Sequence, residues 1–142
     1  MIKKIGIGVV LVLAAAFVVI QFLPYGHQHT NPPVVQEPNW PDQQTRDLAV
    51  RACYDCHSNE TVWPWYSNVA PISWLIENDV VDVRHVLNFS QWRNSRHAVG
   101  EISEVIHSGY MPPSYFITMH PDAKLSDTEK QALIVGLLST VQ

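Results

Sequence analysis

The chain has 142 residues, of which 46% are hydrophobic, and its 13 Asp and Glu residues outnumber its nine Lys and Arg residues. This length predicts one small domain with an additional segment, and the acidic balance argues against a nucleic-acid partner. All the acidic residues lie at or after Glu37, so the later part of the chain is more acidic than the whole. Such a charge suits association with basic partner surfaces, although solubility alone would also explain it.

The N-terminus has a short basic start followed by an almost uninterrupted apolar run over 5–23. A helix of this length would rise roughly 28 Å, close to the thickness of the hydrocarbon core of a bilayer. The run continues past the alanines at 14–16, so an uncleaved membrane anchor over 1–23 is preferred to a removed signal peptide. Because Lys3 and Lys4 mark the cytoplasmic side, the chain is predicted to cross the bacterial inner membrane once, with the remainder on the periplasmic side.

The segment over 24–41 holds five prolines among polar residues, which predicts a semi-extended tether. Two histidines in this tether, His27 and His29, are interpreted as solvated side chains. The folded domain is predicted to occupy 42–142. At about a hundred residues this domain is small for a purely apolar core, and such domains often need an internal staple.

A helix is predicted from Asp42 into the sequence Cys-Tyr-Asp-Cys-His at 53–57, because apolar residues recur there at three- and four-residue spacing. Two cysteines separated by two residues and followed by a histidine form the attachment signature of c-type haem. Cys53 and Cys56 would project from one side of a turn and form thioethers to two vinyl groups, while His57 would bind the iron as proximal ligand. One covalently attached haem c would then serve as the staple.

Other chemistries also use a Cys-x-x-Cys pair. A thioredoxin-like redox couple belongs with a βαβ pattern, and none follows here. Half of a zinc site would need further nitrogen or sulfur ligands, and the chain has no second cysteine pair. Covalent haem attachment is therefore preferred, with zinc, dithiol chemistry and coincidence as the alternatives.

Three elements are predicted in the middle of the chain. The aromatic stretch over 61–66 is interrupted by a proline, and it is interpreted either as rings packed against the cofactor or as ordinary aromatic core. A helix with proline at its first position is predicted over 71–82. A further helix is predicted over 95–108, where Ser95 caps its start and Gly109 ends it.

A methionine follows this helix in the sequence Gly-Tyr-Met-Pro-Pro at 109–113. Two successive prolines restrict the backbone, which suits a segment that must hold a thioether at a fixed distance from iron. Met111 is therefore predicted to be the distal iron ligand, although filling a gap in the core is the commoner role of methionine. The reserve candidates are Met119, His120, His107, His97 and His85.

The last predicted element is a helix that begins with a capping box at 126–129 and ends near Thr140. No segment shows a clear strand period. The domain is therefore predicted to be all-α.

The motifs assembled above resemble those of the haem-binding domain family of small exported monohaem cytochrome-like proteins. The matching stretches are Cys53–Asn59, Trp63–Tyr66, Leu87–Trp92, Gly109–Pro113, and His120-Pro121 with Leu125-Ser126. The resemblance implies a cytochrome-c-like helical fold with one covalent haem and with His57 as proximal ligand, and it is consistent with Met111 as distal ligand.

These features predict a membrane-anchored monohaem c-type cytochrome that carries single electrons between membrane or periplasmic redox proteins. If His57 and Met111 fill both axial positions, no site is open for a substrate, so the protein is not predicted to be an enzyme. A haem enzyme or gas sensor with an open distal site is one alternative. A structural haem subunit of a larger membrane redox complex is the other. The predicted cofactor-binding residues are Cys53, Cys56, His57 and Met111, of which the last two bind the iron.

Overall fold

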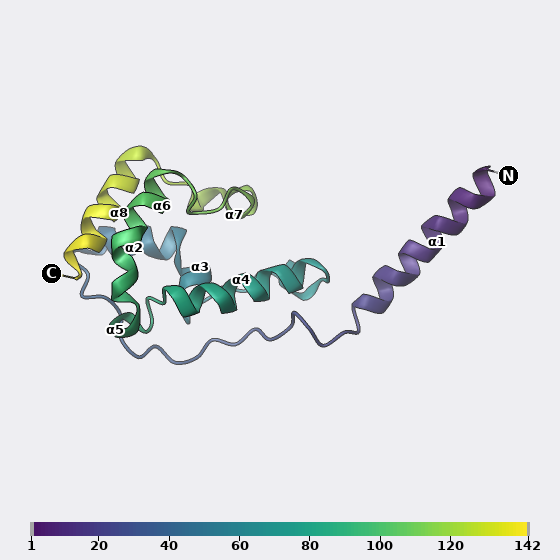
Figure 1. Ribbon diagram of the computed structural model, residues 1–142, viewed down its shortest axis with the longest axis horizontal. Coiled ribbons are helices and arrows are strands. Elements are labelled where there is room, and N and C mark those ends of the chain that lie inside the picture. Colours follow the sequence, from purple (N-terminus) through teal and green to yellow (C-terminus); the bar gives the residue numbers. More distant parts are fainter. Residues whose placement is uncertain (1, 142) are drawn as a thin grey trace. The chain divides into compact units, whose positions relative to one another are not determined.

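The computed structural model describes residues 2–141, and side chains from 6 onward, so the side chains of Lys3 and Lys4 lie outside the described part. The regular elements of this part are helices (Figure 1). The α-helices are α1 (Ile2–Ile20), α2 (Gln43–Ala52), α3 (Tyr54–His57), α4 (Ile72–Val86), α5 (Trp92–Ser95), α6 (Val99–His107), α7 (Ser114–Met119) and α8 (Asp127–Ser139). Three short 3-10 helices are η1 (Trp65–Asn68), η2 (Arg96–Ala98) and η3 (Pro121–Ala123). The prediction of an all-α domain is confirmed.

The chain forms two compact units. The first contains the chain up to His29 together with Trp63–Asp79, and the second contains Thr30–Val62 and the chain from Val80 onward. The second unit carries all four predicted cofactor-binding residues, which are Cys53, Cys56, His57 and Met111.

The prediction of a membrane anchor over 1–23 is wrong. Among the residues that the structure describes, no helix has both the length and the apolar character needed to cross a membrane. The α1 helix ends before Gln21, whose side-chain amide exchanges two hydrogen bonds with the backbone of Ala70, at 3.0 and 2.9 Å. The single-pass location in the inner membrane depended on this anchor and is overturned with it.

In the first unit, the segment after α1 contacts the beginning of α4. Gly26 has a φ of +82°, and a Cβ atom at this position would overlap the side chain and backbone of Trp74. The amide of Gln28 donates to the carboxylate of Glu77 at 2.7 Å. These residues of the predicted tether therefore make defined contacts.

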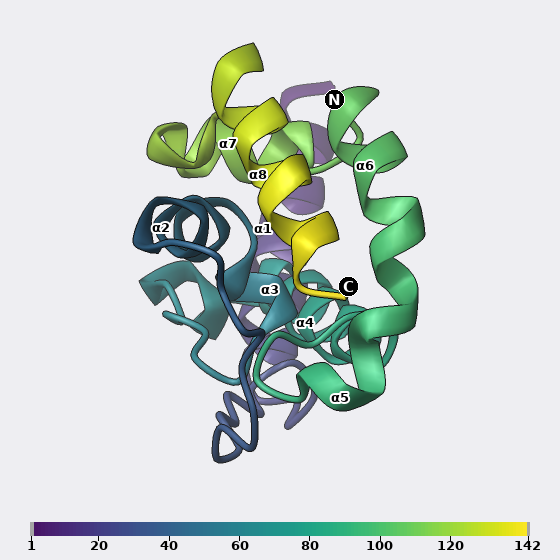
Figure 2. The same cartoon turned by 90° about the vertical axis from the view of Figure 1, so that its left-hand side faces the viewer.

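The core of the second unit lies where α8 packs against α2 and α6 (Figure 2). The α8 helix begins with the predicted capping box, in which Ser126 and Glu129 each bond the backbone of the other. Glycine at 136 lets α8 approach α2 closely, because a Cβ atom there would overlap the side chain of Thr45. The buried apolar side chains of the three helices are Leu48, Ala49, Ala52, Val99, Ile102, Ile106, Leu133, Ile134 and Leu137.

The helix predicted over 95–108 is divided into the end of α5, the 3-10 helix η2 and α6. The side chain of Ser95 does not cap a helix. Its hydroxyl instead accepts a hydrogen bond from the amide of Asn88 at 2.9 Å. The predicted end is confirmed, since Gly109 follows α6 with a φ of +76°.

The second half of the predicted tether pairs with the loop before α5. The amides of Val35 and Gln36 both donate to the carbonyl oxygen of Ser90, at 2.9 and 3.1 Å. The amide of Trp92 donates in return to the carbonyl oxygen of Gln36 at 3.0 Å. The extended segment is thus fixed to the second unit by backbone hydrogen bonds.

Candidate functional site

The two cysteines and the histidine of the predicted attachment motif lie on one helical turn. The α2 helix ends at Ala52, Cys53 interrupts it with a φ of −129°, and α3 begins at Tyr54. The carbonyl oxygen of Cys53 accepts hydrogen bonds from the amides of Cys56 at 3.2 Å and His57 at 2.8 Å. The predicted continuous helix is therefore broken at the first cysteine, yet both thiols and the imidazole are still presented by a single turn.

The ring of His57 is held in one orientation by the loop that follows α4. Its Nδ1 lies 3.1 Å from the carbonyl oxygen of Leu87, and because that oxygen can only accept, Nδ1 carries the proton and Nε2 keeps its lone pair. Burial lowers the pKa of His57, which favours the neutral imidazole that binds metal ions. The amide of Phe89 also donates to the carbonyl oxygen of His57 at 2.8 Å. The loop thus fixes both the ring and the backbone of this residue.

The two cysteines are not joined in a disulfide, and both are half-buried. Burial and, to a smaller extent, the neighbouring Cys56 raise the pKa of Cys53 to about 12. A redox couple of the thioredoxin type needs an attacking cysteine with a lowered pKa, so Cys53, whose pKa is raised, is poorly suited to that role.

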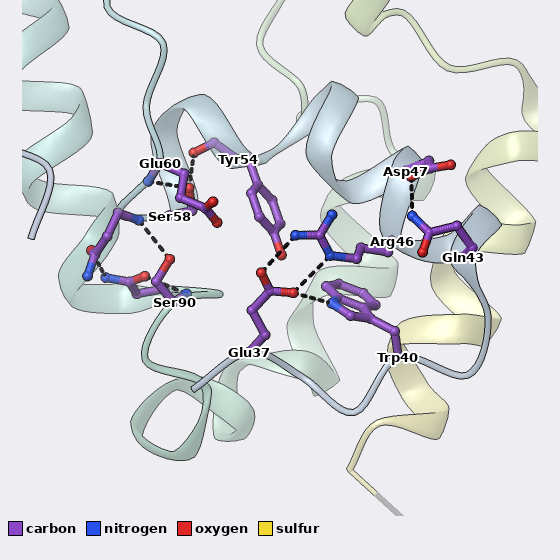
Figure 3. Close-up of polar contacts among 11 residues, drawn as sticks. Glu37, Trp40, Gln43, Arg46, Asp47, Tyr54, Ser58, Glu60 and Ser90 are labelled. Carbon is purple, nitrogen blue, oxygen red and sulfur yellow. Dashed lines mark hydrogen bonds and ion pairs between the residues drawn. The ribbon is translucent and has the colours of Figure 1, made fainter. Parts of the chain in front are cut away.

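Tyr54 anchors the turn between the two cysteines. Its buried ring stacks on Phe89 with centroids 5.4 Å apart, and the guanidinium carbon of Arg46 lies 5.8 Å from its centroid. Arg46 forms two hydrogen bonds with the carboxylate of Glu37, at 2.8 and 2.9 Å, and the indole nitrogen of Trp40 donates to the same carboxylate. Figure 3 shows the Tyr54 side chain directed toward this pair. These contacts hold the start of α3 against α2 and the preceding segment.

The side chain of Arg84, in α4, holds the loop that follows α3. Arg84 donates to the carbonyl oxygen of Ser58, the residue directly after His57, and to the hydroxyl of Thr61. Thr61 in turn donates to the carbonyl oxygen of Asp55 within the turn, at 2.8 Å. The residues on both sides of the predicted iron ligand are therefore tied down.

Met111 lies on a separate segment of the same unit, in the loop between α6 and α7. Its side chain is half-buried, and its amide donates to the carbonyl oxygen of Val105 at 3.0 Å. Buried Pro112 follows it, so the backbone of this methionine is held on both sides. The structure places Cys53, Cys56 and His57 on one turn, whereas Met111 lies on a different segment. The role of Met111 as iron ligand stays a prediction.

The reserve ligands have less restrained surroundings. Met119, at the end of α7, is 57% exposed, and His120 next to it stacks on Phe116 with ring centroids 4.3 Å apart. The remaining three histidines, at 85, 97 and 107, are exposed. Of these two methionine side chains, that of Met111 is therefore the less exposed.

The sequence did not indicate which residues orient the ring of His57. The acceptor for the ring is the backbone carbonyl of Leu87. Every residue has such a carbonyl, so the residue type at 87 does not indicate this role. Asn88 and Ser90, in the same loop, bond the loop after α3, and Arg84 does the same from α4. The signal present in the sequence was the Leu-Asn-Phe-Ser stretch noted above among the family-like motifs.

These residues fit a haem. In the described part of the chain, no group of three or more His, Cys, Asp or Glu side chains could hold a metal ion by itself. A haem iron needs only axial ligands from the protein, and an imidazole with its Nδ1 bonded to a carbonyl and its Nε2 available is the usual form of such a ligand.

Comparison with known families assigns the class of protein. The family described as "Haem-binding domain" matches residues 15–138. The chain therefore belongs to the haem-binding domain family, and the resemblance that its motifs indicated is confirmed. No curated protein and no solved structure matches the chain. Haem is thus the cofactor of this protein.

Proposed function

We propose that this haem-binding protein is a monohaem c-type cytochrome that carries single electrons. Cys53 and Cys56 would hold the haem through thioethers, with the sulfur and hydrogen of each thiol adding across one vinyl double bond. His57 would bind the iron through Nε2. When bound, haem iron supplies reversible one-electron chemistry.

The observation that carries this proposal is the orientation of the His57 ring. Its Nδ1 proton is held by the carbonyl oxygen of Leu87 at 3.1 Å, so the ring presents Nε2 on the same turn as both thiols. A histidine that served only to fill space would not need its ring fixed while one nitrogen stays available. The spacing of the three groups and this orientation together support attachment and proximal ligation by one segment.

Met111 is proposed as the second axial ligand. Its loop is bonded to α6 through Val105, and the two following prolines restrict the backbone. A thioether in this position stabilises reduced iron and raises the potential relative to two imidazoles. With both axial positions filled, electrons would pass to and from partner redox proteins without a substrate site, and the acidic surface favours partners that present basic patches.

Covalent attachment is tested by a pyridine haemochrome spectrum of the denatured protein produced together with a haem-maturation system. We expect one haem per chain with the spectrum of two thioethers, and a single-thioether spectrum for Cys53→Ala and for Cys56→Ala. Extraction of all haem by acidified acetone from the wild-type protein would overturn the proposal.

The distal ligand is tested by the weak far-red band that sulfur ligation gives to oxidised haem. We expect this band in the wild-type protein and in Met119→Ala, the matched control, but not in Met111→Ala. A high-spin ferric spectrum and rapid carbon monoxide binding in the wild-type protein would instead indicate an open distal site, as in a haem enzyme or gas sensor.

A further inference from the structure

We propose that Ser95 is a positioning residue for His57, acting through the peptide group that joins Leu87 and Asn88. This inference rests on the proposed function, in which His57 binds the iron. It adds a residue on a different helix, 38 positions along the chain, to those that set the electronic properties of the site.

The relation follows from two hydrogen bonds on one peptide group. The carbonyl oxygen of Leu87 lies 3.1 Å from Nδ1 of His57, and the amide of Asn88 donates to Oγ of Ser95 at 2.9 Å. These carbonyl and amide groups belong to the same planar peptide unit, so fixing one end fixes the direction of the other. Ser95 therefore sets the direction in which the acceptor of the His57 proton points.

The same geometry also affects the strength of the bond to the imidazole. Hydrogen bonds in series polarise one another, so an amide that donates to Ser95 makes its carbonyl a better acceptor. A stronger acceptor on Nδ1 makes the imidazole a better electron donor through Nε2. Ser95 is thus placed to tune the iron ligand without touching it.

The loop that carries this peptide is fixed by further buried polar contacts. The side chain of Asn88 donates to Asn59 Oδ1 and accepts from the amide of Ser90, both at 2.9 Å. The amide of Asn59, two residues after His57, donates to Oγ of Ser90 at 2.9 Å. Asn59, Asn88, Ser90 and Ser95 are all at most 5% exposed. A buried network in which these polar groups are paired holds the loop in one conformation. Ser95 connects this network to α5.

The chain offers a matched control for removal of the hydroxyl. Ser73, in α4, is buried like Ser95, but its hydroxyl has no hydrogen-bond partner in the described part of the chain. Ser73→Ala therefore makes the same chemical change at another buried site without removing a bond. Ser95→Thr keeps the hydroxyl and serves as the conservative variant.

The test measures the midpoint potential of the holoprotein and the shifted haem methyl resonances of its oxidised form by proton NMR. Weaker donation by His57 destabilises oxidised iron, so Ser95→Ala is expected to raise the potential and change the methyl pattern. Ser95→Thr and Ser73→Ala are expected to retain the wild-type values. A Ser95→Ala protein with wild-type potential and methyl pattern would overturn the inference.

Two further measurements keep the outcomes distinct. Amide hydrogen exchange of the wild-type protein should be slow at Asn88. Fast exchange there would show that the hydrogen bond to Ser95 does not form. That result would overturn the inference even if Ser95→Ala failed to fold. The pyridine haemochrome spectrum of the wild-type protein tests the proposed function separately. If covalent haem is present and only the Ser95 effects are missing, the inference fails and the proposed function stands.

Discussion

Nε of Arg84 donates to the carbonyl oxygen of Ser58 at 2.7 Å, which ties α4 to the residue that directly follows His57. The same guanidinium donates to the carbonyl oxygen of Thr30, to Oδ1 of Asn31 and to Oγ1 of Thr61, at 2.9, 3.1 and 2.7 Å. These acceptors come from the segment before α2 and from the loop after α3. One planar cation therefore joins three parts of the second unit around the proposed iron ligand.

Replacing Arg84 by alanine should destabilise the protein by about 2–4 kcal/mol, because several hydrogen bonds from a charged donor are lost together and the freed carbonyl of Ser58 is buried. Arg84→Lys should recover less than half of this loss, since an ammonium group lacks the planar fork that reaches all four acceptors. Urea unfolding of the holoprotein measures both. Arg93→Ala, at an exposed position on α5, is the control and should change stability by less than about 0.5 kcal/mol. Equal stability of the Arg84 and Arg93 variants would contradict the prediction.

The close approach of α8 to α2 predicts opposite effects for two glycine-to-alanine changes. Gly136→Ala places a methyl group against the side chain of Thr45 and should cost about 1–3 kcal/mol. Gly100→Ala, in α6, meets no atom within 4 Å and should gain up to about 1 kcal/mol from helix propensity. Thermal unfolding of the two variants compares them directly.

A double variant shows whether the contact with Thr45 causes the loss. Thr45→Ala removes the atoms that the new methyl group would meet, so the cost of Gly136→Ala should be smaller in that background. If Gly136→Ala and Gly100→Ala shifted the unfolding temperature in the same direction, the proposed clash would not exist.

The sequence predicted features that depend on residue type and local spacing. The capping box at 126–129, the end of α6 at Gly109 and the thiol and imidazole groups on one turn each follow from a few neighbouring residues. The apolar run at the N-terminus was misjudged, because hydropathy counts residues without showing where the helix ends, and α1 ends at Ile20 with Gln21 bonded to Ala70.

The rest of the site could not be predicted because its contacts are long-range and use backbone atoms. Serine is a common helix-capping residue, yet the hydroxyl of Ser95 accepts a hydrogen bond from the amide of Asn88, seven positions earlier. The acceptor for the His57 ring is a carbonyl 30 positions away, and its direction depends on the path of the loop rather than on the side chain of Leu87. Residue patterns therefore predicted which groups would bind haem, but not which groups orient them.

Tyr54, between the two cysteines, should tolerate the loss of its hydroxyl group. Tyr54 is 3% exposed and its hydroxyl has no hydrogen-bond partner among the described residues, while its ring stacks on Phe89. Burial of this hydroxyl raises the pKa of Tyr54, so the group stays neutral. Tyr54→Phe keeps the ring and removes an unsatisfied polar atom, so it should leave stability unchanged or raise it by up to about 1 kcal/mol.

Urea unfolding and haem content measure this result. Tyr54→Leu, which lacks the stacked ring, is the comparison and should be clearly less stable than Tyr54→Phe. A loss of more than about 1 kcal/mol in Tyr54→Phe would show that the hydroxyl has a partner that stabilises the fold.

The capping carboxylate of Glu129 predicts a specific acid dependence of stability. The backbone amide of Ser126, the side chain of Arg51 and the hydroxyl of Ser126 lower its pKa from 4.5 to about 2. Between these two values the unfolded chain binds a proton that the folded chain does not, so the stability from this group is complete above about pH 4.5 and is lost as the pH falls toward 2. Glu129→Gln cannot titrate, so the wild-type protein should be the more stable at neutral pH and the two should converge near pH 2.

Unfolding by urea at a series of pH values measures this difference in stability. Arg51→Gln should reduce the difference without abolishing it, because the bonds to Ser126 remain. Parallel stability curves for the wild-type protein and Glu129→Gln across this range would show that the carboxylate does not stabilise the helix start through its charge.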